Sequence, residues 1–184
     1  MSIRILKESC QVIVVDIQQK LAPHLAGAQA MIEASTKVLR GAQLFDIPIT
    51  IAEQYPQGLG ESVAPVKPFK EQNVFSKTSF SCFGNEALSA ALLKKKSEGR
   101  NTLIVVGCEA HVCVLQTVID ALEHHFRVAV IDDAVASRKL ADKALAQNRL
   151  SLAGAEYLSS EMLLFEWTQS KQAPQFKQIS ALVK

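Results

Sequence analysis

The chain has 184 residues and a formal net charge of +2, from 20 basic and 18 acidic side chains. This length fits one domain, expected to span residues 1–184, which can bury a core without disulfides or a structural metal. The near balance of charge argues against nucleic acid or an anionic membrane as the main partner.

The sequence contains no candidate membrane span, because its longest apolar runs have about five to seven residues and a bilayer requires ~20. The first residues include Arg4, Lys7 and Glu8 and form no long apolar stretch, so no secretory signal is visible. We therefore expect a soluble, cytoplasmic protein.

Four cysteines occur in the chain, and in a reducing compartment we expect free thiols. They are Cys10, Cys82, Cys108 and Cys113. The last two do not have a zinc-ligand spacing, and no pair of histidines completes a metal site. We expect no metal and no other cofactor, so these thiols serve either reactivity or packing.

Short apolar, β-branched runs alternate with stretches of helical periodicity. Strands are expected at 12–15, 48–52, 73–75, 102–106, 127–131 and 156–158. Helices are expected at 29–44, 85–97, 111–123, 139–153 and from Ser159 or Ser160 to 167, with a short helix or tail after 174. Residues 55–72 hold three prolines and two glycines and are predicted to form a long, functional loop.

This alternation predicts an α/β fold, a doubly wound and mainly parallel six-stranded sheet with helices on both faces. Such a sheet binds ligands at the carboxyl ends of its strands, where strand order reverses. The residues just after the strands are therefore the candidates for function: Asp16, Glu53 and Gln54, Ser76 and Lys77, residues 107–113, and Asp132 and Asp133.

Cys113 lies about one turn into a predicted helix that follows the most apolar strand. Unpaired N–H groups and the positive end of the helix dipole would lower the pKa of its thiol and could hold an oxyanion. The alternative is a small buried hydrophobe, which is a common role for free cysteine.

Asp16 ends an apolar strand, where a carboxylate needs a cation or hydrogen-bond donors. It could take the thiol proton as a general base, or it could simply cap a turn. Lys77 could pair with Asp16 and stabilise a thiolate, although a lysine after a strand is often just solvated.

Three separated motifs resemble the isochorismatase-like cysteine hydrolases, in the order found in that family. They are the segment 14–18 around Asp16, Lys77 after a short strand, and the segment 107–114. The resemblance runs from about Gln11 to Trp167. Residues 53–60 and 115–117 make it most similar to the isochorismatase domain-containing branch.

The resemblance implies a doubly wound parallel sheet and an Asp–Lys–Cys triad made of Asp16, Lys77 and Cys113. In the family, the aspartate is the general base, the lysine tunes both partners and the cysteine attacks. A non-proline cis peptide would fall between Cys108 and Glu109. The backbone N–H groups of Glu109 and Cys113 would form the oxyanion hole.

Two departures from the family pattern restrict the activity. Many members have threonine where this chain has Ala110. The nicotinamidase branch has an Asp-x-His metal motif where this chain reads 52–55 as Ala-Glu-Gln-Tyr, which argues against a metal-dependent nicotinamidase. Enzymes that hydrolyse isochorismate itself generally lack the cysteine, so that activity is not expected either.

The predicted function is hydrolysis of a small amide or related acyl substrate through a thioester at Cys113. Gln18, Tyr55, Phe80 and Phe83 are candidates for the substrate pocket. For the aromatic candidates, and for Trp167, a place in the core is the open alternative.

Self-association as a dimer or higher oligomer is also expected. The predicted helix 111–123 is apolar nearly all round, although a helix on a sheet needs an apolar stripe only about 100° wide. Either the following helix or a second subunit would cover the rest. The alternative function is therefore a catalytically idle oligomer that binds a ligand or a partner.

Overall fold

The computed structural model describes residues 3–69 and 74–184, and six of its strands form one sheet in the order β3-β2-β1-β4-β5-β6. All neighbouring strands pair in parallel, which confirms the predicted doubly wound α/β fold. The strands are β1 Cys10–Val15, β2 Ile49–Gln54, β3 Val74–Lys77, β4 Thr102–Cys108, β5 Arg127–Ala136 and β6 Glu156–Leu158.

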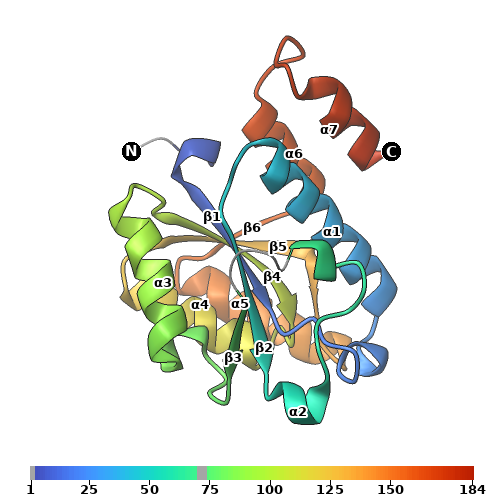
Figure 1. Ribbon diagram of the computed structural model, residues 1–184, viewed down its shortest axis with the longest axis vertical. Coiled ribbons are helices and arrows are strands. Elements are labelled where there is room, and N and C mark those ends of the chain that lie inside the picture. Colours follow the sequence, from blue (N-terminus) through green and yellow to red (C-terminus); the bar gives the residue numbers. More distant parts are fainter. Residues whose placement is uncertain (1–2, 70–73) are drawn as a thin grey trace.

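Helices cover both faces of this sheet, with α1, α6 and α7 on one side and α3, α4 and α5 on the other (Figure 1). Their bounds are α1 Ala28–Leu44, α2 Pro56–Leu59, α3 Glu86–Ser97, α4 Cys113–Glu123, α5 Leu140–Leu152, α6 Ser160–Thr168 and α7 Phe176–Val183. In the described part of the chain, none of these helices has the length and apolar character to span a bilayer.

Strand β1 shows why its sequence is continuously apolar rather than alternating. Val12 and Val14 pack into the core beneath α1 and α6, whereas Ile13 and Val15 pack into the core beneath α3 and α4. A parallel strand inside such a sandwich has no solvent-facing side, so every position favours an apolar residue.

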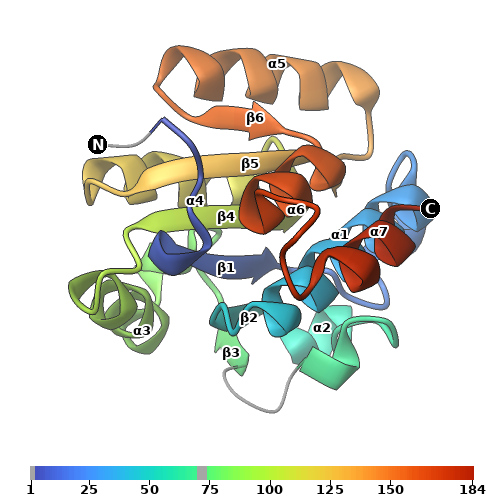
Figure 2. The ribbon, with the colours of Figure 1, turned by 90° about the horizontal axis from the view of Figure 1, so that it is seen from above.

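The strand order reverses beside β1, which lies between β2 and β4 (Figure 2). Gly107 of β4 pairs with Val15 there. A Cβ atom at Gly107 would lie 2.0 Å from the Val15 carbonyl oxygen, and its φ of +125° also favours glycine. The chain therefore favours glycine at position 107, where a ligand crevice is expected.

One predicted boundary was wrong at the sheet, the end of the fifth strand. Asp132 and Asp133 lie inside β5 rather than after it, because β5 advances by five residues, from 130 to 135, where β4 advances by two, from 105 to 107. Asp133 then accepts hydrogen bonds from the backbone and hydroxyl of Ser160 at the start of α6. Both aspartates are therefore set apart from the predicted site.

The remaining predicted elements were confirmed within a few residues. The predicted loop 55–72 contains the short helix α2 and a 3-10 turn at Lys67–Phe69. The cap of α6 is Ser159, whose side chain accepts from the Met162 N–H. Residues 70–73, which were assigned to this loop and to the start of the third strand, lie outside the described residues.

Candidate active site

Asp16 is the first residue after β1, and its backbone has a φ of 52°, which turns the chain sharply. Its N–H donates to the Ala52 carbonyl at 3.2 Å. Its own carbonyl accepts the Gln18 N–H at 2.9 Å and the Cys108 thiol at 3.1 Å. These backbone contacts hold Asp16 between β2 and β4, and its carboxylate is completely buried.

Lys77 is the last residue of β3, and its ammonium group is buried with four acceptors around it. They are Gln54 Oε1 at 2.7 Å, Asp16 Oδ2 at 2.8 Å, and the carbonyl oxygens of Phe80 at 3.0 Å and Ser79 at 3.2 Å. An ammonium has three protons, so the protein already uses all of them. Lys77 thus acts on its neighbours through its charge.

Cys113 is the first residue of α4 rather than one turn inside it, and it is 6% exposed. The Asp16 carboxyl and the Cys113 thiol are close enough for each to shift the pKa of the other. Asp16 Oδ1 is buried and has no hydrogen-bond partner among the described residues. Of the two carboxylate oxygens, Oδ1 is therefore the one available for the thiol proton.

The expectation of a lowered thiol pKa was wrong. Burial raises the pKa of Cys113 well above its ordinary value, and the negative charge of Asp16 raises it further, while Lys77 opposes both effects. Burial also raises the pKa of the Asp16 carboxyl, against the opposing effect of Lys77. At neutral pH the thiol is therefore protonated and needs a base, and the adjacent carboxylate is more basic than an exposed one.

Between the end of β4 and the start of α4, the backbone N–H groups of Glu109, His111 and Cys113 have no backbone acceptor among the described residues. The peptide bond between Cys108 and Glu109 is cis, as the family resemblance implied. The N–H groups of Val112 and Val114 both donate to the Glu109 carbonyl, at 3.0 and 3.2 Å. The two predicted oxyanion donors are therefore among the N–H groups left without a backbone acceptor.

This segment is held in place by the last residue of β5, Ala136, and by Arg138 just beyond it. Glu109 Oε2 accepts from both the backbone N–H and the Nε of Arg138, each at 3.0 Å. The N–H of Ala110, where many family members have threonine, donates to the Ala136 carbonyl at 2.8 Å. The side chain of Glu109 is thus occupied by Arg138, and only its backbone N–H remains available.

The assignment of Gln18 to the substrate pocket was wrong. Its buried Nε2 donates to the carbonyl oxygens of Gln54 and Gly60, at 2.9 and 2.6 Å, and its Oε1 accepts the Gln54 N–H at 2.7 Å. These bonds use both amide protons. Gln18 therefore joins the end of β2 to the following loop instead of facing a substrate.

Phe83 was also wrongly assigned to the pocket. Its ring stacks on His124, with a centroid distance of 4.9 Å and an interplanar angle of 26°. His124 follows the last residue of α4, whereas Cys113 is the first. The length of α4 thus separates Phe83 from the thiol, and Phe83 packs against the core as the alternative allowed.

Tyr55 and Phe80 remain candidates for the pocket wall, with exposed fractions of 55% and 52%. The backbone of each contacts Lys77: the Tyr55 N–H donates to the Lys77 carbonyl at 2.9 Å, and the Phe80 carbonyl accepts from Nζ. Trp167, in contrast, is completely buried and packs edge-on against Phe45. Trp167 is therefore a core residue.

Sequence analysis gave Gln54 no role beyond its place after the second strand. Its Oε1 holds Lys77, where the nicotinamidase branch would have a metal-ligand motif. Next to it, Glu53 Oε1 accepts from the N–H and hydroxyl of Ser62. Across residues 3–69 and 74–184, no cluster of three or more His, Cys, Asp or Glu side chains is arranged to hold a metal.

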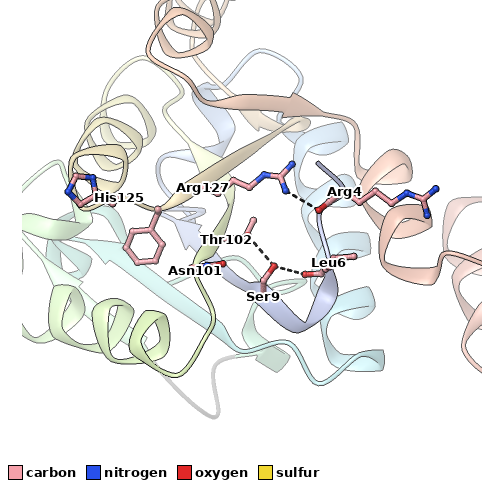
Figure 3. A pocket seen from close by; sticks show the side chains of 8 residues that line it. Arg4, Leu6, Ser9, Asn101, Thr102, His125 and Arg127 are labelled. Atoms are coloured by element: carbon pink, nitrogen blue, oxygen red, sulfur yellow. Dashed lines mark hydrogen bonds between the residues drawn. The ribbon is translucent and has the colours of Figure 1, made fainter. Parts of the chain in front are cut away.

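A cavity of about 420 Å³ lies at the opposite end of the sheet, where Thr102 begins β4 and Arg127 begins β5. Figure 3 shows the Arg127 guanidinium directed to the Arg4 backbone, while the charged end of Arg4 and the ring of His125 point away from the centre. This cavity is remote from Cys113 and offers it no substrate pocket.

Comparison with known proteins identifies the family. A family model described as the isochorismatase domain matches residues 10–162. Isochorismatase domain-containing protein 2A of Mus musculus is 34% identical over 184 residues, covering 98% of this chain and 85% of the relative. Isochorismatase domain-containing protein 1 of Danio rerio is 34% identical over 169 residues, or 92% of this chain, which spans only 59% of that relative's length.

A solved structure described as the MAR1 ribonuclease of Caenorhabditis elegans has a TM-score of 0.90 and 33% identity, and the match covers 98% of this chain and 92% of that one. The matched segment 10–162 contains Asp16, Lys77 and Cys113. On sequence and fold together, the chain belongs to the isochorismatase family, and it is similar to that family's domain-containing branch.

Proposed function

We propose that the protein hydrolyses a small amide or related acyl substrate, with Cys113 as nucleophile, Asp16 as general base and Lys77 as the fixed positive charge beside them. The observation that carries this proposal is the buried Lys77–Asp16 pair, 2.8 Å between Nζ and Oδ2, next to a thiol at a helix start. A buried ion pair beside a nucleophile is typical of sites that control proton transfer.

In the first half-reaction, Asp16 Oδ1 takes the Cys113 proton as Sγ attacks the substrate carbonyl carbon. The developing oxyanion accepts hydrogen bonds from the Glu109 and Cys113 N–H groups. The tetrahedral intermediate then collapses with cleavage of the carbon–nitrogen bond. Asp16 returns the proton to the leaving amine, and the acyl group stays on Cys113 as a thioester.

In the second half-reaction, water replaces the amine. Asp16 accepts a proton from the water while the water oxygen attacks the thioester carbon. The N–H groups of Glu109 and Cys113 stabilise the second oxyanion. The carbon–sulfur bond breaks, the acid leaves, and the proton on Asp16 returns to the thiolate. Lys77 keeps its protons throughout and stabilises the negative charge as it moves between Asp16 and Sγ.

RNA cleavage is a second candidate, because the structure at 33% identity carries the name of a ribonuclease. Phosphodiester cleavage needs donors or cations that reach the phosphate oxygens. Lys77 already donates its protons to protein acceptors, and the overall charge is only +2. We therefore favour acyl transfer and include RNA in the test.

The decisive experiment compares the wild type with Cys113→Ala over a panel of small amides, esters and single-stranded RNA. Mass spectrometry of the intact protein checks for an acyl adduct on Cys113. Cys10→Ala is the matched control, because this buried thiol lies at the far end of β1. Hydrolysis should disappear in Cys113→Ala alone, and activity that survives this substitution would overturn the nucleophile assignment.

The catalytically idle alternative has its own signature. It is favoured if the wild type hydrolyses nothing in the panel and Cys113 also resists alkylation.

We further propose a cytoplasmic location, in which the four thiols, all buried and none in a disulfide, stay reduced.

A further inference from the structure

Helix α4 carries a row of side chains that continues from the proposed nucleophile down one face. Cys113, Thr117, Asp120 and His124 follow at spacings of four, three and four residues. Positions three and four apart lie above one another on a helix. A single face of α4 therefore links its first residue to the residue that follows its end.

Apart from Cys113, each member of this row holds the segment 81–83. Thr117 Oγ1 accepts the Cys82 N–H at 3.0 Å, and Asp120 Oδ2 accepts the Ser81 hydroxyl at 2.5 Å. At the far end, His124 stacks on the Phe83 ring. The segment is thus fastened along the same helix face that presents Cys113.

The residues just before this segment hold Lys77. The carbonyl oxygens of Ser79 and Phe80 accept from Nζ at 3.2 and 3.0 Å. The Ser79 hydroxyl donates to the Ser81 carbonyl at 2.9 Å, which makes 79–81 a compact turn. One continuous set of hydrogen bonds therefore joins the face of α4 to the lysine ammonium.

We propose that Thr117 and Asp120 are positioning residues, which fix the distance between the Lys77 ammonium and Cys113 by fastening the 79–83 segment to the helix that carries the thiol. This inference rests on the proposed function, since it assigns a purpose to Lys77 beside a nucleophile. Neither side chain is expected to touch the substrate.

The sign of the effect separates positioning from a direct influence of the Asp120 charge. A carboxylate near a thiol raises the thiol pKa, so removal of its charge alone would lower that pKa and speed alkylation. Lys77 has the opposite influence, because its charge lowers the pKa of Cys113. If Asp120 acts by holding Lys77 in place, its removal must slow alkylation.

The test measures the rate of Cys113 alkylation by iodoacetamide from pH 6 to pH 10. The other three cysteines are 0% exposed, and Cys113→Ala provides the blank. Thr117→Val and Asp120→Leu should slow alkylation at pH 7 roughly 3- to 10-fold and move the profile to higher pH. Thr117→Ser and Asp120→Asn keep an acceptor and should stay within about twofold of wild type.

Gln116→Ala is the matched control, because Gln116 is exposed on the same helix. Ser81→Ala removes the other half of the Asp120 bond and should reproduce the Asp120→Leu profile, so it replaces that variant if Asp120→Leu does not fold. An unchanged or faster profile in the folded disruptive variants overturns the positioning role. A wild-type Cys113 that resists alkylation at every pH overturns the proposed function instead.

Discussion

Lys77 Nζ lies 2.8 Å from Asp16 Oδ2, and both side chains are completely shielded from solvent. Two charges are thus removed from water at the carboxyl edge of the sheet, one just after β1 and one at the end of β3, with β2 between these two strands. Desolvation makes such a pair costly to build, and the loss of one partner leaves the other charge uncompensated. The pair is therefore a strong structural constraint as well as a candidate for chemistry.

The first prediction concerns the stability of this pair. Lys77→Met and Asp16→Asn should each lower the free energy of unfolding, by about 3–5 kcal/mol, because each leaves a buried charge without its partner. Asparagine suits position 16 because it tolerates the left-handed backbone there. The double variant should lose less than the sum of the two. Urea unfolding measures all three values, and simple additivity would contradict the coupling.

The fold could be predicted well from the sequence because buried parallel strands leave a strong signal. Runs such as 12–15 and 103–106 are apolar at every position, and the structure buries each of them on both faces. Where the prediction was wrong, tertiary pairing decided the outcome. The extra residues that carry Asp132 and Asp133 into β5 depend on the register against β4, which no local pattern reveals.

The site could be predicted only in part, for a similar reason. The positions of Asp16, Lys77 and Cys113 follow from strand ends and the family resemblance. Their environment does not, because the thiol pKa depends on burial and on the nearby carboxylate. The hydrogen bonds of Thr117 and Asp120 were also missed, although their spacing of four and seven residues from the cysteine was a usable signal.

A second prediction separates thiol reactivity from catalysis. The Asp16 charge raises the pKa of Cys113 and the Lys77 charge lowers it. Asp16→Asn should therefore shift alkylation by iodoacetamide to lower pH, and Lys77→Met should shift it to higher pH. Hydrolysis should be lost in both variants, because Asp16→Asn lacks the base and Lys77→Met lacks the positive charge that stabilises the thiolate. Shifts of the same sign in the two variants would contradict this electrostatic arrangement.

A third prediction concerns the tight contact between β1 and β4. Gly107→Ala would place a methyl group 2.0 Å from the Val15 carbonyl oxygen, so we expect a loss of about 3 kcal/mol or more in unfolding free energy. Gly99→Ala is the control, because Gly99 also has a positive φ of +95° but no atom within 4 Å of the added carbon. It should cost only about 1–2 kcal/mol. Equal losses in chemical denaturation would show that crowding at Gly107 is unimportant.

A fourth prediction is that the reaction requires no metal. Gln54 and Glu53, which stand where the nicotinamidase branch has its metal motif, are bound to Lys77 and Ser62. Hydrolysis should therefore persist at the wild-type rate after exhaustive chelation and removal of the chelator. Activity that falls and returns on addition of zinc or iron would refute this.

The last prediction is self-association. The structure favours a different helix for the interface from the one that the sequence indicated. On the helix expected to form it, α4, the apolar residues Leu115, Ile119 and Leu122 are already partly buried against the core. The following helix α5 instead exposes Leu145 and Leu152, with exposed fractions of 69% and 82%.

Leu145 and Leu152 are seven residues apart, so they lie on one face of α5. Sedimentation at micromolar concentration should show a species larger than 20.1 kDa, and closed two-fold symmetry is the commonest form of such assemblies. Leu145→Glu combined with Leu152→Glu should dissociate it without lowering the unfolding midpoint of the monomer. Gln116→Glu, which adds a charge at an exposed position on α4, should leave it intact.

A wild type that sediments as a monomer would end the proposal. Dissociation by the α4 charge alone would move the interface back to that helix, where a partner would also lie close to Cys113.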